Sequence, residues 1–579
     1  MKKEFIISDF KEAVKQKELL TDHCTEDLWE VVSYETANIS GSLLIASQDT
    51  FPQPVTIEPD LEGWYKIFVC MTAFEGQNST FLQLTDDEFS THLKSGSVQE
   101  YVSWHLSEQV EEVFWKAADM TGQDITISKV DFGEPHTANI CWLRFVSMTD
   151  EEVESYNKSL LDTSSKTMIA HLDGDFDRYD MSKTPHDYCK AIYSMKDSDV
   201  KIICKEIIND FHILDSIDEN TFVGRNAWAK TRAKSWIQFH KWREEIHKEQ
   251  ISYAHAHGME MYATHRVSLS NFVFPSETPL LTEAFVSEHP EFRCKARDGR
   301  YVDYLSFAYK EVRDYRIDNL KTACKQGFDG VNLLFIRGIN VAFEEPVIER
   351  FNEKYGDSID CRRLPATDSR IHGIWCDILT DFMRELRAAL DVKIFVTTLF
   401  SIADNLFNGI DVERWAKEGL IDGVIQGKMR MWEEIDDVLD DDGLINIEQY
   451  SKKAETQYVL RRNWGDISLV IEGIPEYRKI SDKYGIAFYS ELPWETTVPP
   501  VELIKIVKEI YQSGGMHLAL WDCYPARVIY RPEWQCTSQM GSLEKVNKLS
   551  MNKEDYRKVY KILSYAGKDI RYYHPSWRG

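Results

Sequence analysis

The sequence predicts a (β/α)8 barrel, an α/β fold, preceded by a smaller antiparallel β-sandwich, and three observations support this. The chain has 579 residues, more than one ordinary domain needs, and 43% of them are hydrophobic, enough for more than one core. Before about residue 160, apolar residues recur at every second position, as in half-buried strands. After that point, apolar runs alternate with amphipathic helical patterns, which is typical of parallel strands joined by crossover helices.

The N-terminal part, residues 1–160, contains short β-type runs separated by turn-rich segments. The clearest runs are Trp64–Met71, Thr80–Leu84, Asp124–Val130 and Asn139–Met148. This spacing favours an antiparallel sandwich, which we expect to support the barrel or to bind carbohydrate. Between these runs, Glu111–Ala118 is expected to be irregular or a helical turn, and Asp150–Ser159 a polar linker.

Residues 161–530 supply eight candidate strands in alternation with helical patterns, which predicts a closed TIM barrel. The strands are Thr167–Leu172, a weak second one in Phe211–Val223, Met259–Thr264, Gly330–Ile336, Lys393–Leu399, Gly423–Gly427, Gly485–Ser490 and Met516–Leu520. A doubly wound open sheet is the alternative, but no G-x-G-x-x-G follows any of these runs. Residues 531–579 are expected to form a helical extension.

Composition and charge exclude several partners. The formal net charge of −27 argues against nucleic acid and anionic membranes, and no run of eighteen apolar residues could span a bilayer. Eleven cysteines without a C-x-x-C pair indicate reduced thiols. The N-terminus lacks the pattern of a signal peptide, so we expect a cytoplasmic protein, or a secreted one if a signal peptide was removed. No cofactor is implied, and a homo-oligomer stays open.

Carboxylates follow three of the candidate strands at their carboxyl ends, where barrel enzymes place their chemistry. Asp173 follows the first strand, Glu491 the seventh and Asp522 the eighth. Hydrolysis of an acetal needs one carboxylic acid to protonate the leaving oxygen and one carboxylate to act as nucleophile or base. We therefore predict Glu491, paired with Asp522 or Asp173, as the catalytic residues.

Polar and aromatic side chains at or beyond the same strand ends are the candidate substrate-binding residues. They are His265, Arg266, Asn332, Arg337, Glu345, Lys428, Trp494 and Trp521. Tryptophan faces stack on sugar rings, while the other side chains hold hydroxyl or carboxylate groups. The cations allow two interpretations, since they could bind the carboxylate of an acidic sugar or orient the catalytic carboxylates by ion pairs.

Several phrases of the barrel half resemble a bacterial group of family-10-like glycosyl hydrolases. They are DGRYVDYLSFAYKEVRDYRIDNL, GFDGVNLLFIRG, FMRELRAAL, FNGIDVERWAKEGLIDGVI and GGMHLALWDCY, between about Lys166 and Arg527. The resemblance implies a TIM barrel that acts on an oligosaccharide or glycoside. Retaining barrel glycosidases carry an acid/base Glu directly after the fourth strand, but here that strand reads NLLFIRG and no acid appears before Glu344. Only Glu491 matches that pattern, by position.

Two other functions remain open. A metal-dependent barrel hydrolase, such as an amidohydrolase or deacetylase, could use His171, Asp173, His265 and Asp522 as ligands, although the first strand lacks an H-x-H pair. A non-catalytic carbohydrate-binding protein is the other alternative, because the expected fourth-strand acid is missing.

Overall fold

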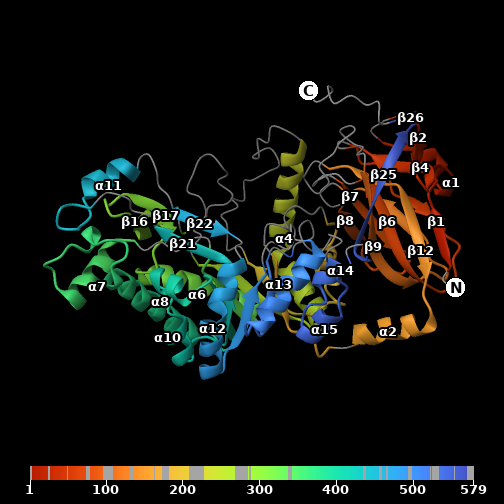
Figure 1. Ribbon diagram of the computed structural model, residues 1–579. Helices are drawn as coiled ribbons and strands as arrows, with labels where there is room; N and C mark the ends of the chain where they lie inside the picture. Colours follow the sequence, from red (N-terminus) through yellow and green to blue (C-terminus); the bar gives the residue numbers. More distant parts are fainter. Residues whose placement is uncertain are drawn as a thin grey trace.

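An N-terminal antiparallel β domain and a larger (β/α)8 barrel make up the protein in the computed structural model (Figure 1). The structure describes residues 3–569 apart from a set of internal segments. These segments are 24–26, 48–49, 73–77, 95–108, 131–135, 162, 173–181, 208–226, 268–284, 286–287, 337–341, 434–438, 455–459, 465–466, 493–498, 522, 524–533 and 553–554. None of the helices in the described part is long and apolar enough to cross a membrane.

Two antiparallel sheets with a shared core form the N-terminal domain. The larger sheet contains β1 (Glu4–Ile7), β12 (Trp142–Ser147), β6 (Trp64–Thr72), β9 (Gln109–Asp119), β25 (Arg557–Tyr565), β3 (Trp29–Thr36), β4 (Ser40–Ala46) and β11 (Ala138–Ile140), in that order. The smaller sheet contains β5 (Val55–Ile57), β10 (Ile125–Ser128), β7 (Ser79–Leu84) and β8 (Thr91–Lys94). The domain also contains the short elements α1 (Phe10–Ala13), η1 (Lys17–Leu19), β2 (Leu20–Thr21), which pairs with β3, and β26 (Lys568–Asp569), which pairs with β25. The antiparallel character expected from the alternation is confirmed.

The segment expected to be irregular, Glu111–Ala118, is instead the central part of β9, which pairs with β6 and β25. Two adjacent charged residues, Glu111 and Glu112, hid the alternation. Both side chains are buried, and each has a partner that compensates its charge. Glu112 accepts hydrogen bonds from Trp142 Nε1 at 2.8 Å and from Arg144 Nε at 2.9 Å. Glu111 forms an ion pair with Arg557.

The segment expected to be a polar linker forms a helix, α2 (Asp150–Leu161), between the domains. Thr149 and Glu152 make a reciprocal capping box: Glu152 N lies 3.3 Å from Thr149 Oγ1, and Thr149 N lies 3.1 Å from Glu152 Oε2. This T-x-x-E pattern is a helix start signal that is visible in the sequence.

Eight parallel strands close into a barrel, which confirms the predicted fold class. They are β13 (Met168–Leu172), β14 (Val200–Glu206), β15 (Glu260–Arg266), β18 (Gly330–Leu334), β19 (Lys393–Thr398), β20 (Gly423–Gln426), β23 (Ala487–Glu491) and β24 (His517–Leu520). The second strand was wrongly placed in Phe211–Val223, all of which lies outside the described residues. The true strand, VKIICKE, was obscured by the charged residues at its end.

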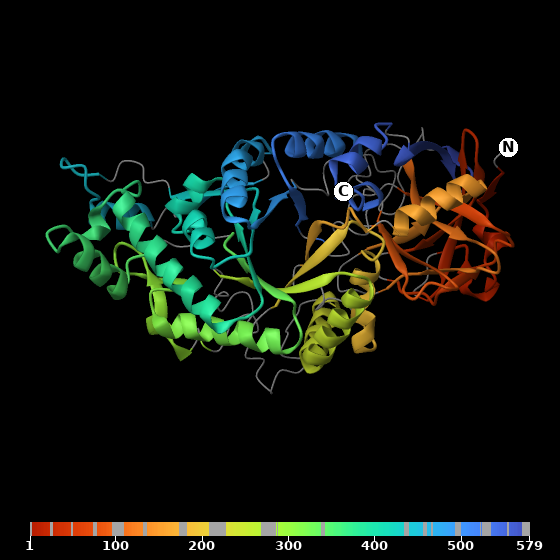
Figure 2. The same ribbon diagram turned by 90° about the horizontal axis from the view of Figure 1, so that it is seen from below.

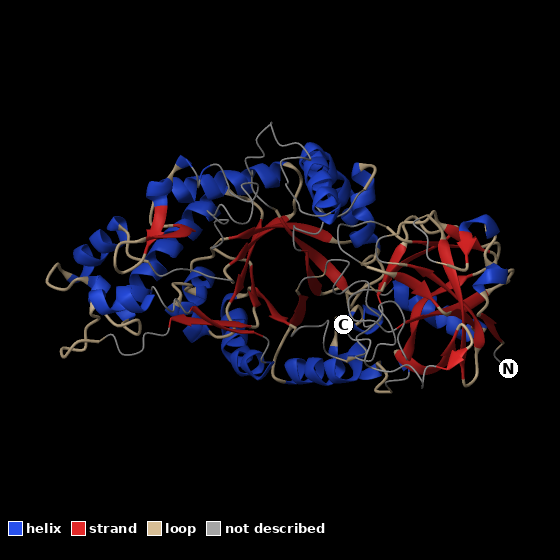
Figure 3. Cartoon of the chain, turned by 90° about the horizontal axis from the view of Figure 1, so that it is seen from above, coloured by secondary structure: helices blue, strands red, loops and turns tan. Residues whose placement is uncertain are grey.

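Helices surround the barrel, and the strands form a ring when seen along its axis (Figures 2 and 3). The main ones are α4 (Ala227–Ala256), α6 (Lys310–Lys325), α7 (Glu345–Tyr355), α8 (Ser369–Ala389), α9 (Ile402–Phe407), α10 (Val412–Lys417), α12 (Ile467–Tyr484) and α13 (Pro500–Gln512). Hairpins β16–β17 (Arg293–Lys295, Tyr301–Leu305) and β21–β22 (Met429–Glu433, Leu460–Trp464), and helix α11 (Ile447–Ala454), lie in the connections that follow barrel strands.

Alternate residues of each barrel strand face opposite ways, and two separate cores result. Side chains such as Tyr262, Phe395 and Tyr489 meet inside the barrel. Their sequence neighbours, such as Ala263 and Phe488, join the core between the strands and the helices. Because this alternation has a period of two, it fixes which residues at the strand ends can face the barrel mouth.

The C-terminal segment returns to the N-terminal domain and is not wholly helical as expected. Short helices α14 (Trp534–Thr537) and α15 (Leu543–Lys548) are followed by β25, which inserts between β9 and β3 (Figure 1). The sequence of β25, RKVYKILSY, mixes charged and apolar residues over nine positions, a pattern that suits a strand with one buried face.

Replacing Arg557 by Met is expected to lower the free energy of unfolding by about 3 kcal/mol, since it removes the ion-pair partner of a fully buried carboxylate. Denaturant unfolding followed by tryptophan fluorescence measures this. The exposed neighbour on the same strand provides the control, and Lys558→Met should change stability by less than about 0.5 kcal/mol. Equal effects of the two variants would contradict the importance of the Glu111–Arg557 pair.

Candidate active site

Several side chains that face the barrel interior lie at the carboxyl ends of the strands, and most of them are polar. Because alternate residues of a strand face inward, they are His171 on β13, Glu206 on β14, Arg266 on β15 and Glu491 on β23, together with Trp521 directly after β24. These side chains are all buried or nearly so. Residues at this end of a TIM barrel are the ones that bind and transform substrates.

Glu491 is held by Lys428 through both its side chain and its backbone. Lys428 Nζ lies 3.2 Å from Glu491 Oε1, and Lys428 N donates to Glu491 Oε2 at 3.1 Å. Lys428 Nζ also donates to the carbonyl oxygen of Leu492 at 3.0 Å. An ammonium group at this distance offsets part of the cost of burying a carboxylate charge.

A glycine makes this approach possible. A β-carbon at position 427 would lie 2.4 Å from the carbonyl oxygen of Thr398 and 3.2 Å from Glu491 Oε2. Only glycine therefore lets the chain after β20 pass so close to the carboxylate. Gly427 thus allows Lys428 to contact Glu491 in two ways, as a backbone N–H donor and as an ion-pair partner.

A second buried ion pair joins the neighbouring strands β14 and β15. The Arg266 guanidinium binds Glu206 in a two-pronged manner, with Nε donating to Oε1 and Nη2 to Oε2, the latter at 2.9 Å. The guanidinium carbon also lies 5.8 Å from the ring centre of Trp521. On the adjacent strand, the His171 ring stacks on Trp521 with centroids 4.1 Å apart and planes inclined by 3°.

Trp521 also belongs to an apolar cluster at the mouth. Trp521 packs there with Leu334, Ile336 and Leu399, which come from or directly follow β18 and β19. The indole is 4% exposed and has His171 stacked on its ring. Trp521 therefore lies at the top of the barrel interior, and the stacking of its ring on a sugar stays a prediction.

Two of the predicted substrate-binding residues lie elsewhere. His265 is on the outward side of β15, between the inward-facing Thr264 and Arg266, where burial and the charge of Arg316 on α6 hold its pKa well below 6.5. Asn332 lies inside the barrel one layer below the mouth. It donates to Thr264 Oγ1 at 3.3 Å and accepts from Thr397 Oγ1 at 3.0 Å. Neither side chain lies at the barrel mouth among the described residues, and a role of either in binding substrate stays a prediction.

The two glutamates after the fourth strand belong to a separate contact between α7 and the β16–β17 hairpin. Glu345 is exposed and pairs with Lys295 at 2.7 Å, and this hydrogen bond lowers the pKa of Glu345. It stays ionised near neutral pH and is unsuited to donate a proton. Glu344 is fully buried beside Ser306 and Cys294, and burial raises its pKa to about 7.

Four predicted residues, Asp173, Asp522, Arg337 and Trp494, lie outside the described residues. Asp173 directly follows β13, and Asp522 directly follows Trp521. Their catalytic and binding roles therefore remain predictions.

Glu206 is the residue at the mouth that sequence reasoning missed. The error in placing the second strand removed it from consideration, although an apolar β-type run ending in Lys-Glu-Ile was visible. The structure also separates the ligands of the metal hypothesis, because His171 faces inward and His265 outward. Within the described residues, no group of three or more His, Cys, Asp or Glu side chains could hold a metal ion.

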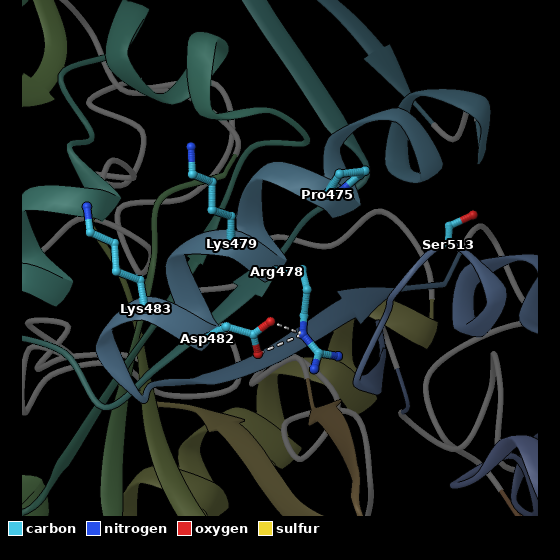
Figure 4. Close-up of a pocket in the computed structure, with 6 residues that line it drawn as sticks. All are labelled: Pro475, Arg478, Lys479, Asp482, Lys483 and Ser513. Atoms are coloured by element: carbon cyan, nitrogen blue, oxygen red, sulfur yellow. Dashed lines mark hydrogen bonds and ion pairs between the residues drawn. The ribbon is translucent and has the colours of Figure 1, made fainter.

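Figure 4 shows the lining of a surface pocket of about 610 Å³. Its lining residues are Pro475, Arg478, Lys479, Asp482, Lys483 and Ser513. They belong to the carboxyl end of α12 and the end of α13, just before β23 and β24 begin. The pocket is therefore at the amino end of the strands, which serves stability in TIM barrels.

No protein-family model and no curated protein matches the chain. Solved structures do resemble it. The catalytic domain of a β-amylase from Paenibacillus polymyxa has 10% identity and a TM-score of 0.35, over 61% of this chain and 92% of that one. An α-galactosidase from Thermus thermophilus has 8% identity and a TM-score of 0.31, over 89% and 95%. At such values the similarity assigns no substrate or reaction.

Glu344→Gln is expected to change how stability depends on pH. The wild-type carboxyl has a folded pKa of about 7 against an ordinary value of 4.5. The folded state therefore loses stability as pH rises from 4.5 through 7, where the unfolded chain ionises first. Between pH 5 and 8, the variant should gain about 1–3 kcal/mol relative to wild type, measured by denaturant unfolding.

Glu345→Gln is the matched control, because its carboxyl is exposed and ionised throughout this range. Its stability relative to wild type should not vary between pH 5 and 8. A Glu344→Gln curve parallel to that of wild type would contradict the raised pKa.

Proposed function

We propose that this chain is a glycoside hydrolase in which Glu491 acts as an ionised carboxylate, either the nucleophile or the base that activates water. The observation that carries this proposal is the pair of contacts that Lys428 makes with Glu491, through its side chain and its backbone N–H, at the carboxyl end of the seventh barrel strand. A carboxylate held in this way can attack the anomeric carbon or remove a proton from water. The proton for the leaving oxygen must then come from another group.

Asp522 and Asp173 are the proposed sources of that proton. In sequence Asp173 directly follows β13, and Asp522 is the second residue after β24. Strand β24 pairs with both β13 and β23. Neighbouring strands are spaced by about 4.8 Å, so acids from this arc can reach the separations of about 5–5.5 Å or about 6.5–9.5 Å that retaining and inverting enzymes use. Glu345 is not proposed for this role, because Lys295 keeps it ionised.

Arg266 and Glu206 are proposed to position the substrate. Glu206 fixes the guanidinium in one plane through its two-pronged contact, which limits the directions in which Arg266 can donate to sugar hydroxyls. The pair contributes no net charge to the mouth. Lys428 and Glu491 are likewise balanced, so the described part of the mouth favours an uncharged sugar unit over an acidic one.

Glu491→Gln tests the catalytic assignment. It keeps the shape of the side chain and removes the ionisable group, so kcat should fall by about 10²–10⁴-fold. Hydrolysis of a panel of aryl glycosides identifies a substrate, and kcat and the melting temperature are then measured for each variant.

Glu502→Gln is the control, since it makes the same chemical change at an exposed carboxylate in the first turn of α13. A folded Glu491→Gln protein that keeps kcat within about threefold of wild type would overturn the assignment. Glycan binding without hydrolysis by the wild-type protein would instead favour the non-catalytic alternative.

The substrate charge is tested at Arg337, the remaining predicted cation after the fourth strand. Arg337→Lys should raise KM for an acidic sugar far more than for its neutral analogue if Arg337 makes bidentate contacts with a substrate carboxylate. With an uncharged substrate class, as the balanced mouth favours, KM should change equally for both sugars. The ratio of the two KM changes decides between these outcomes.

A further inference from the structure

The turn after β7 of the N-terminal domain contacts a cluster of aromatic rings on the barrel. Phe89 is buried there against three rings: His186 in the 3-10 turn Pro185–Cys189, Tyr193 in α3 (Lys190–Tyr193), and Tyr253 in α4. The centroid distances are 5.4, 5.6 and 6.2 Å. The contact joins the two domains near α4, and Figure 1 shows β7 and β8 facing that helix.

His186 lies between one carboxylate from each domain. Its Nε2 is 3.0 Å from Glu88 Oε1 of the N-terminal domain, and its Nδ1 is 3.3 Å from Glu249 Oε2 of α4. A neutral imidazole carries a single N–H and can donate to only one of these oxygens, whereas an imidazolium donates to both. The geometry therefore suits the protonated ring.

We propose that His186 is a proton-dependent latch between the domains: the imidazolium bridges Glu88 and Glu249, and loss of its proton releases the bridge. Deprotonation leaves one of the two carboxylates without a hydrogen bond from His186 and removes the positive charge between two negative ones. The Phe89 contact remains, so the domains stay joined but hold each other less tightly.

The groups around His186 support this behaviour. They are Asp87 and Glu88 on the turn, Lys116 on β9, Asp187 and Cys189 beside His186, Tyr193 and Lys196 near α3, and Glu249, Tyr253 and His257 on or after α4. Asp87 is matched by Lys116 and Tyr193, and Asp187 caps its own turn by accepting from Thr184 N. Glu88 also accepts from Tyr253 Oη at 2.5 Å.

Partial burial by itself would lower the pKa of His186, but the hydrogen bonds to Glu88 and Glu249 outweigh it and raise the pKa above 6.5. For Glu88, burial is opposed by the hydrogen bonds from Tyr253 and His186, and its pKa is lowered below 4.5. A raised histidine pKa means that the bridge is complete below pH 6.5 and is lost as pH rises through the folded pKa.

The latch acts on the first βα connection of the barrel. The turn that carries His186 is fixed to α4, because Gln250 Nε2 donates to the Tyr188 carbonyl at 2.8 Å and Tyr188 packs on Phe239. This connection begins after β13 with Asp173, one of the proposed proton donors. The protonation of His186 therefore affects how firmly the N-terminal domain holds a connection that leads to the barrel mouth.

Amide hydrogen exchange of the full chain tests the latch, with rates corrected for the intrinsic effect of pH. Protection of residues 85–90 and 185–193 in wild type should fall by about threefold between pH 6 and pH 8, a modest change because the three side chains are about half exposed. His186→Gln and Glu249→Gln should show the lower protection at both pH values.

Glu245→Gln is the matched control, an exposed glutamate one turn earlier on α4 that should behave as wild type. Melting temperatures of all variants are measured to detect general loss of structure, which would lower protection in the barrel core as well. Wild-type protection that does not change with pH overturns the proposal, and so does a pH-dependent fall that persists in His186→Gln.

Discussion

Ion pairs between neighbouring strands allow the barrel mouth to bury its charges. A lone ionised glutamate in such a place would cost several kcal/mol, and the neighbouring cation offsets that cost only when the geometry is good. Glu491 meets Lys428 across β20 and β23, and Glu206 meets Arg266 across β14 and β15. The chemistry proposed for the mouth depends on these pairs, since they compensate the charge of its carboxylates and fix their orientation.

The same pairing also divides the mouth into distinct regions. The two ion pairs come from strands on opposite sides of the ring, and Trp521 lies with the apolar residues Leu334 and Leu399. The stacked His171 links this tryptophan to the first strand. A sugar would therefore meet fixed carboxylates and a guanidinium above an apolar floor.

The N-terminal domain is connected to the barrel by more than the chain that joins them. Strand β25 brings the C-terminal segment back between β9 and β3, and its Arg557 neutralises the buried Glu111. At another place Phe89 and Glu88 contact α3 and α4. Strand β25 therefore makes the larger sheet of the N-terminal domain depend on a segment that follows the barrel in the sequence.

The sequence by itself determined the fold class, because strand and helix periods of two and 3.6 are local properties. It also determined Glu491 as a mouth residue, since a carboxylate at the end of an apolar strand has one favoured location in a barrel. Two further elements also have local signals in the sequence. The T-x-x-E capping box indicates the start of α2, and the apolar run that ends at Glu206 indicates β14.

Only the tertiary structure decided which side of a strand each residue faces and which partner it meets. A shift of one residue moves a side chain from the barrel interior to the helices, which is why Arg266 reached the mouth and His265 did not. The pairs Lys428–Glu491, Arg557–Glu111 and His186–Glu88 join residues far apart in the chain. Their contacts arise from barrel closure and domain docking, which no local pattern records.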